Sequence, residues 1–218
     1  MMDKIPVIAL LAIMNKLTPI ALYGRQMEEV KRRINVVTHF LHAPGHAVYF
    51  QPAVESASLQ IRKILERIAF GSLIANRELY EQTYRNFSRT WKADLLLKDL
   101  ARINQRYFPV PIKPNPTKRV DGSIEHELVV DGWLTPEDFT EAYEACNSLL
   151  HATNPYRVER DMKQMAEKLM LWRNKIIQLL NIHEVHFVDQ RTMWVVNMQE
   201  DGDEHVHFYE FEQVDGNG

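Results

Sequence analysis

The sequence contains one cysteine and none of the short motifs that mark the commonest enzyme sites. A single thiol cannot form an internal disulfide, so Cys146 does not imply an oxidising compartment. The patterns G-x-x-x-x-G-K-[ST], G-x-G-x-x-G, H-E-x-x-H and G-x-S-x-G are all missing. These absences argue against the commonest nucleotide-binding, zinc-protease and hydrolase folds, and they leave other kinds of enzyme open. We expect Cys146 to be a small buried residue within an apolar helix pattern.

Long hydrophobic runs and a strong excess of one charge are also lacking. The apolar segment 5–14 is too short to cross a bilayer, which takes about 20 residues, and no small-residue cleavage site follows it. We therefore expect a helix there that is buried in the protein or against a partner, a cytoplasmic protein, and no membrane partner. The formal net charge of −3 gives no electrostatic reason to expect tight non-specific binding to DNA.

The chain has the length and composition of an ordinary globular protein that buries a real core. It has 218 residues, of which 45% are hydrophobic and 25% charged. We predict a mainly α (α+β) fold, a multi-helix bundle with a short hairpin insertion and a C-terminal three-stranded antiparallel meander. The predicted single domain, 1–218, comprises a helical part (1–106), a proline-rich connector with a hairpin (107–134), further helices (135–181) and the β-meander (182–214).

Apolar residues at helical spacing define the first helical part. Thr18 and Pro19 are typical of a helix start, and Pro44-Gly45 of a helix end. Between them an apolar stripe recurs at alternating steps of four and three residues: Tyr23, Met27, Val30, Ile34, Val37 and Leu41. Similar spacing predicts a helix over residues 53–75. Two further helices are predicted over 77–91 and 93–104, where Asn76 and Asp94 suit the caps or first turns.

The connector and the start of the second helical part carry residues that are typical of turns and of helix starts. Four prolines in residues 107–116 predict an extended segment. Asp-Gly turns at 121–122 and 131–132 bracket a short strand or hairpin over residues 124–130. A strong helix start at Thr135 predicts a helix that reaches about His151.

The longest helical pattern comes next. After it, the spacing of apolar residues changes from that of a helix to that of strands. Its apolar seam predicts a core helix, with an intermolecular coiled-coil-like contact as the alternative: Val158, Met162, Met165, Leu169, Trp172, Ile176 and Leu179. Residues 182–188, 192–198 and 205–212 are rich in aromatic and β-branched side chains. These three segments predict the strands of the meander.

Glu55, Arg62 and Glu66 fall on one face of the helix predicted over residues 53–75, and form our candidate binding stripe. Arg62 and Glu66 are one turn apart and can pair. The stripe can be a solvated or boundary salt bridge of little energetic weight, an ion network between helices, or a catalytic carboxylate site. Leu59 and Phe70 lie near the same side, which indicates a helix with two neighbours.

Arg32 and His39 are the candidate catalytic residues. They lie on one face of the first striped helix, about two turns or ~10 Å apart, and point away from the apolar stripe. RNA cleavage needs an arginine that stabilises a phosphate and a histidine that moves a proton. The alternative is a solvated helix face whose cations suit the dipole of the C-terminal end.

Two histidine groups were considered as metal sites, and we expect neither a metal nor another cofactor. The first, His39, His42 and His46, has no Asp, Glu or Cys nearby to complete a ligand set. In the second group, His205 and His207 are two residues apart in a strand and can converge on one face. His183 and His186 are three residues apart and point to different faces. We expect these to be exposed strand histidines.

Two stretches resemble uncharacterised bacterial helical proteins. One is ESASLQIRKILERIA at residues 55–69, and the other combines YFP at 107–109 with HATNPY at 151–156. The long N-terminal helices also resemble the HEPN superfamily, whose members include RNA-cleaving toxins and phage-defence proteins. That family's motif of Arg, a polar residue, a few residues and His is matched by Arg32, Arg33 and His39. The resemblance implies that Arg32 and His39 act together in a cleft, often at a dimer interface.

Our preferred hypothesis is a helical protein-interaction or self-associating module, with a role in bacterial stress or phage defence. It rests on what we interpret as surplus apolar helix surface, and its expected partner is a second copy or another protein. The alternative is a HEPN-like, metal-independent endoribonuclease, and RNA is a partner only under that alternative.

Overall fold

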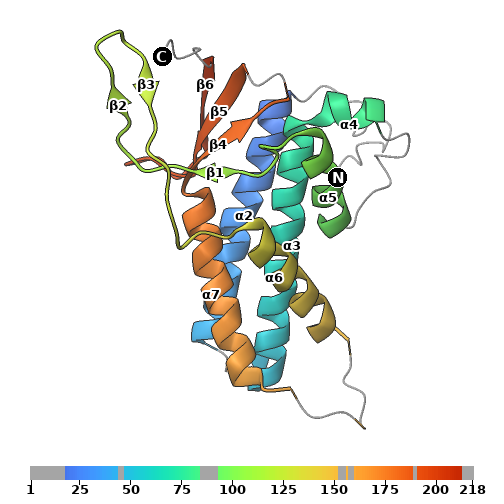
Figure 1. The fold of residues 1–218 in the computed structure, drawn as a ribbon. Coiled ribbons are helices and arrows are strands. Elements are labelled where there is room, and N and C mark those ends of the chain that lie inside the picture. Colours follow the sequence, from blue (N-terminus) through green and yellow to red (C-terminus); the bar gives the residue numbers. More distant parts are fainter. Residues whose placement is uncertain are drawn as a thin grey trace, which may run out of the picture.

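The protein is mainly helical with a smaller β component, as the sequence predicts (Figure 1). The computed structural model describes residues 18–43, 47–83, 93–151, 156, 160–188 and 191–212. Its helices are α2 (Pro19–His42), α3 (Phe50–Ala75), α4 (Arg77–Thr83), α5 (Ala93–Ile103), α6 (Pro136–Leu149) and α7 (Met162–Leu180). Its strands are β1 (Val110–Pro111), β2 (Thr117–Lys118), β3 (Ile124–Glu125), β4 (Ile182–His186), β5 (Thr192–Asn197) and β6 (His207–Glu212). Among the described residues, none of the helices is long and apolar enough to cross a membrane.

Helix α2 forms as the sequence predicts. The Thr18 hydroxyl accepts a hydrogen bond from the Ala21 amide at 3.3 Å, and Pro19 occupies the first turn. The predicted stripe turns toward the core, and five of its members are buried: Tyr23, Met27, Val30, Ile34 and Val37. Three predicted features lie outside the described residues: the apolar segment 5–14, the helix end at Pro44-Gly45, and segment 84–92.

Helix α3 is the central element of the protein. It packs against α2, α5, α6 and α7, and none of its residues from Pro52 onward is exposed. Leu59 and Phe70 are half-buried, which confirms the prediction that this helix has neighbours on more than one side. The prediction that this helix carries surplus apolar surface was therefore wrong, because other helices of the same chain cover that surface.

Helices α6 and α7 pack beside α3 and complete the helical body. A capping box starts α6: the Thr135 hydroxyl accepts from the Asp138 amide, and the Asp138 carboxylate accepts from the Thr135 amide. The Asp161 carboxylate caps α7. The seam of α7 faces the core through Leu169, Trp172, Ile176 and Leu179, which confirms the core interpretation for this part of the seam. Val158 of the predicted seam lies outside the described residues. Cys146 is fully buried on α6, also as predicted.

The sheet lies across one end of the helices in the order β1-β4-β5-β6, with every pair antiparallel. Strand β1 was not predicted, because its prolines indicated only an extended connector. Pro111 fits there because β1 is an edge strand, where a missing N–H costs no ladder hydrogen bond. The strand predicted over residues 124–130 is also shorter than expected. Only Ile124 and Glu125 pair with β2, across a turn whose Gly122 has φ +85°.

A buried hydrogen bond joins the helical body to the sheet. The Tyr23 hydroxyl lies 2.8 Å from His183 Nε2, and His183 Nδ1 lies 2.8 Å from the Leu180 carbonyl oxygen. A carbonyl can only accept, so Nδ1 carries the hydrogen, and Nε2 accepts from Tyr23. Gly71 makes room for the tyrosine, because a Cβ there would lie 3.0 Å from Tyr23 Cε2. Complete burial lowers the pKa of His183 to about 4 and raises that of Tyr23.

The burial of His183 predicts a loss of stability in mild acid. The unfolded chain protonates this histidine below its ordinary pKa of 6.5, whereas the folded protein does so only near pH 4. The unfolded state therefore binds more protons between these values, and the shift corresponds to roughly 3 kcal/mol of unfolding free energy lost as the pH falls. Urea unfolding of His183→Gln, followed between pH 7 and 4, should show a flatter pH dependence than the unaltered protein. Equal slopes would contradict this assignment.

Candidate functional site

Strand β4 is buried on both faces, which is unusual for a sheet with helices on one side only. Successive side chains in a strand point to opposite faces. His183 and Val185 therefore turn to the same face, where His183 contacts Tyr23 of α2. Glu184 and His186 turn to the other face, and they are 5% and 4% exposed. An acid and a histidine buried on the face away from the helices make that face the first candidate site.

Glu184 is the centre of a buried charged cluster. His126, from the segment that follows β3, donates through Nδ1 to one carboxylate oxygen at 2.9 Å. His186 donates through Nε2 to the other oxygen at 2.8 Å. The guanidinium of Arg106 lies 3.5 Å from that second oxygen and reaches toward solvent. The cluster thus joins β4, the segment after α5 and the segment after β3.

The surroundings of Glu184 favour its ionised form. Burial, the largest single effect, acts to raise the pKa of this carboxyl. The hydrogen bonds from His186 and His126, together with their charge, outweigh burial and leave the pKa below its ordinary value. A carboxylate that accepts two hydrogen bonds in a shielded place binds both donors strongly.

The cluster has part of the geometry of a general base, but substrate cannot reach it. A carboxylate on Nδ1 orients an imidazole so that Nε2 can take a proton, as in many hydrolases. The side chain of His126 is only 6% exposed, however, and its ring packs edge-on against Phe211 with the centroids 5.6 Å apart. We therefore interpret the cluster as a clamp that holds the segment around β3 on the sheet.

A pair of buried asparagines connects this cluster, through His186 at the end of β4, to the end of α3. The amide of Asn104 donates to the side-chain oxygen of Asn76 at 2.7 Å and to the backbone oxygen of His186 at 3.2 Å. Asn76 in turn donates to the Ser72 carbonyl at 2.8 Å. Each buried amide has a partner, so the pair locks the end of α3 against β4.

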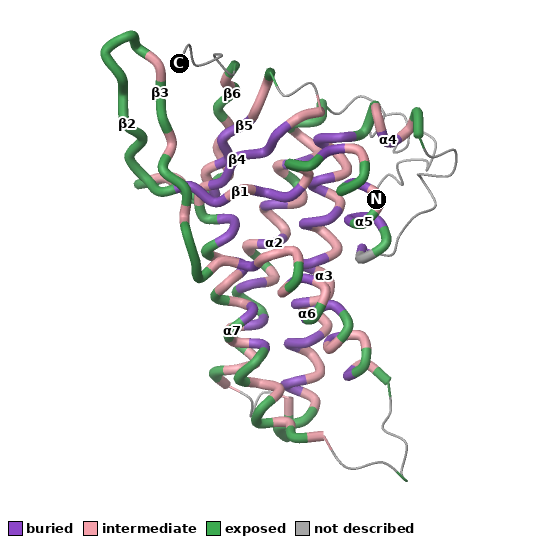
Figure 2. Tube along the Cα trace, viewed as in Figure 1, coloured by how far each residue is buried: buried purple, intermediate pink, exposed green. Residues whose placement is uncertain are grey.

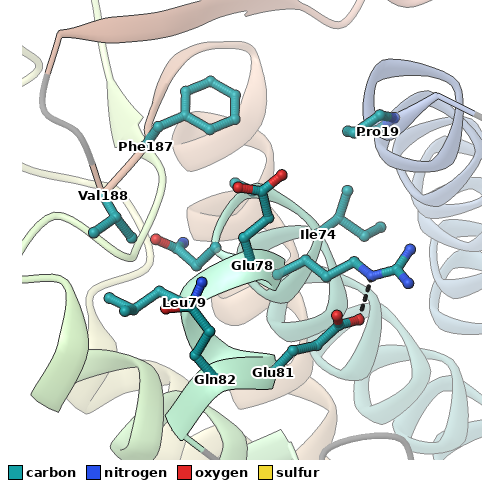
Figure 3. A pocket seen from close by; sticks show the side chains of 11 residues that line it. Pro19, Ile74, Glu78, Leu79, Glu81, Gln82, Phe187 and Val188 are labelled. Carbon is teal, nitrogen blue, oxygen red and sulfur yellow. Dashed lines mark hydrogen bonds and ion pairs between the residues drawn. The ribbon is translucent and has the colours of Figure 1, made fainter.

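Asn76 also lines a cavity of about 650 Å³ at the junction of α3, α4 and the end of β4. It is lined by apolar side chains together with charged and amide groups (Figure 3). This size is within the range of small-molecule sites. The labelled lining residues come from four places in the chain: Pro19 of α2, Ile74 of α3, Glu78, Leu79, Glu81 and Gln82 of α4, and Phe187 and Val188 after β4.

The candidate catalytic residues Arg32 and His39 both lie on the exposed side of α2. Arg32 pairs with Glu29 at 3.5 Å and lines an open hollow of about 500 Å³. The ring of His39 stands edge-on to Phe40, with the centroids 6.0 Å apart. His39 is not among the residues that line this hollow, so the structure does not bring the two candidates into one pocket of a single chain.

The candidate binding stripe divides into two parts. Arg62 and Glu66 form an ion pair at 3.2 Å, and the Arg62 guanidinium lies 5.8 Å from the ring centroid of Tyr143 on α6. Glu55 accepts instead from Gln51 at 2.8 Å. The Arg62–Glu66 pair therefore lies at the boundary between α3 and α6.

The prediction of exposed strand histidines was wrong for His183 and His186, since both are buried. The reason is that β4 is an inner strand, covered by helices on one face and by the His126 segment on the other. His205 is exposed, and His207 lies 3.4 Å from Asp203. In the other group His39 and His42 are exposed on α2, and His46 lies outside the described residues. Within the described ranges, no three His, Cys, Asp or Glu side chains are placed to hold a metal ion.

Sequence reasoning missed Glu184, His126 and the asparagine pair. Glu184 and His186 are two residues apart in a predicted strand, so their shared face could have been read from the sequence. The approach of His126 from 58 residues earlier carries no sequence signal.

No protein family, no curated protein and no solved structure matches this chain.

The clamp predicts a clear difference between two glutamate substitutions. Glu184→Gln places an amide N–H₂ opposite one of two N–H donors, and should lower the free energy of unfolding by about 2 kcal/mol or more. Glu127→Gln, on an exposed side chain paired with Lys113, should change it by less than about 0.5 kcal/mol. Chemical denaturation at pH 7 compares the two. Equal stability of both variants would rule out a clamp.

Proposed function

We propose that this protein is a non-catalytic interaction module that self-associates through the hairpin arm, residues 113–130. The observation that carries the proposal is the exposed apolar surface of this arm. The hairpin arm extends beyond the four-stranded sheet (Figure 1) and is exposed along most of its length (Figure 2). Four large apolar side chains on it are open to solvent: Val120, Ile124, Leu128 and Val130.

A two-stranded hairpin of this kind gains little from its own pairing. Strands β2 and β3 contribute two residue pairs, and an isolated hairpin is marginally stable in water. The arm is held at its base instead, where His126 binds Glu184 and the Val129 amide donates to the Pro111 carbonyl at 3.0 Å. A rigid base and uncovered apolar side chains along the arm are a favourable arrangement for binding another surface.

The charges of the hairpin arm favour a second copy as the partner. Lys113, Lys118 and Arg119 come before Asp121, Glu125 and Glu127 in the arm, so its formal charge is zero with histidine neutral. Two of these cations are already paired inside the arm, Lys113 with Glu127 and Arg119 with Glu125. Two such arms can approach about a two-fold axis without net repulsion, and the opposite signs on the two strands suit that symmetry.

Self-association should depend on the apolar side chains of the arm. Replacing Ile124 and Val130 together by serine removes apolar area from the proposed interface, and should weaken the dissociation constant about tenfold or more. Sedimentation velocity over a concentration series measures it. Leu171→Ser is the control, because Leu171 is an exposed leucine on α7, away from the arm. A monomer at every concentration, or equal weakening by the control, would contradict the proposal.

A row of basic residues along α2 supports the HEPN-like endoribonuclease as the second candidate function. Arg25, Arg32 and His39 are spaced seven residues apart, so they follow one line on the exposed face at about 10 Å intervals. Arg25, Arg32 and Arg67 also line the same open hollow. Such a row is suited to contact successive phosphates of RNA. Glu28 and Glu29 share the hollow and offset part of its charge.

The second candidate predicts RNA cleavage that persists in EDTA and is abolished by Arg32→Ala and by His39→Ala. Both residues are exposed, so the variants should fold as the unaltered protein does. Gel analysis of labelled single-stranded RNA provides the readout. Arg102→Ala, at an exposed arginine on α5, is the control that should leave cleavage intact. Absence of cleavage, or cleavage unchanged in both variants, would remove this candidate.

A further inference from the structure

The cavity at the junction of α3, α4 and the end of β4 has an apolar wall formed from separate parts of the chain. Ile74 of α3, Leu79 of α4, and Phe187 and Val188 after β4 face it (Figure 3). Phe187 is held in place, since its ring packs edge-to-face on Trp194 with the centroids 4.6 Å apart. The buried Asn76 fixes the end of α3 behind this wall. The contact of Phe187 with Trp194 and the hydrogen bonds of Asn76 therefore hold this wall in place.

One carboxylate faces this apolar wall without a charged partner. Glu78 extends between Phe187 and Ile74 (Figure 3), and among the described residues it has no ion-pair partner. The other acid of the rim, Glu81, is paired with Arg77. The described residues that line the cavity include one arginine and two glutamates, so their formal charge is −1 and is concentrated at Glu78.

We propose that this cavity binds a small organic cation, an ammonium group on an apolar body. The ammonium group pairs with the Glu78 carboxylate beside the ring of Phe187, where a carboxylate and an aromatic ring together favour a cation. The apolar body packs against Ile74, Leu79 and Val188. Anionic ligands are disfavoured because the described lining residues already carry a net negative charge. This site is separate from the hairpin arm and from the row along α2, so it does not depend on either proposed function.

Two probes of nearly equal size test the proposal by calorimetric titration of the full chain at pH 7. Phenethylamine carries an ammonium group on a phenyl body, and 2-phenylethanol replaces that group by a neutral hydroxyl. The amine should bind at least about tenfold more tightly than the alcohol. Equal affinities would overturn the proposal, because they would show an apolar pocket without recognition of charge. No binding of the amine would overturn it as well.

Substitutions locate the site of binding. Glu78→Gln keeps the shape of the side chain, removes its charge, and should weaken binding of phenethylamine about tenfold. Glu144→Gln makes the same change of charge on the exposed side of α6 and should leave the affinity within about twofold. Both residues are exposed, so neither change should unfold the protein. Equal weakening by the two variants would show long-range electrostatics instead of a contact at Glu78, and would overturn the assignment.

Discussion

The buried contact between Tyr23 and His183 is the constraint on which the rest of the structure depends. It lies where α2, α3 and the sheet meet, and each of its groups is fully buried. The tyrosine ring fits because position 71 of α3 is glycine, and the imidazole is oriented by the Leu180 carbonyl at the end of α7. Three helices and β4 are thereby held in one relative position. Buried polar groups of this kind specify a single arrangement, because any slip would leave a donor or an acceptor without a partner.

Strand β4 transmits this constraint to the opposite face of the sheet. With His183 fixed toward the helices, the alternation of a strand turns Glu184 and His186 to the other side. Glu184 there holds His126 and so fixes the base of the hairpin arm. The segment after α5 enters the same arrangement through Asn104, which binds both Asn76 and the backbone of His186. One strand therefore orients both the projecting arm and the end of α3.

The two surfaces that we propose to be functional lie at opposite ends of that chain of contacts. The hairpin arm projects from the Glu184 side, and its zero net charge and exposed apolar side chains suit another protein surface. The cavity lies where β4 ends at Phe187, beside the asparagine pair, and the Glu78 carboxylate, which has no ion-pair partner among the described residues, suits a small cation. Each surface is placed by buried polar contacts rather than by its own residues, which explains why neither carries a recognisable motif.

The sequence by itself determined the helical body, because that body follows from local rules. The stripe from Tyr23 to Val37, the cap at Thr135 and the seam of α7 are patterns of periodicity and hydrogen bonding within a few residues, and each lies where it was predicted. Tertiary structure alone decided the rest. Strand β1 exists because β4 offers it an edge, and the buried cluster exists because His126 meets Glu184 across 58 residues of sequence. The prediction that the histidines of β4 are exposed was wrong for the same reason. Burial depends on which segments pack over a strand, and the strand's own residues do not determine those segments.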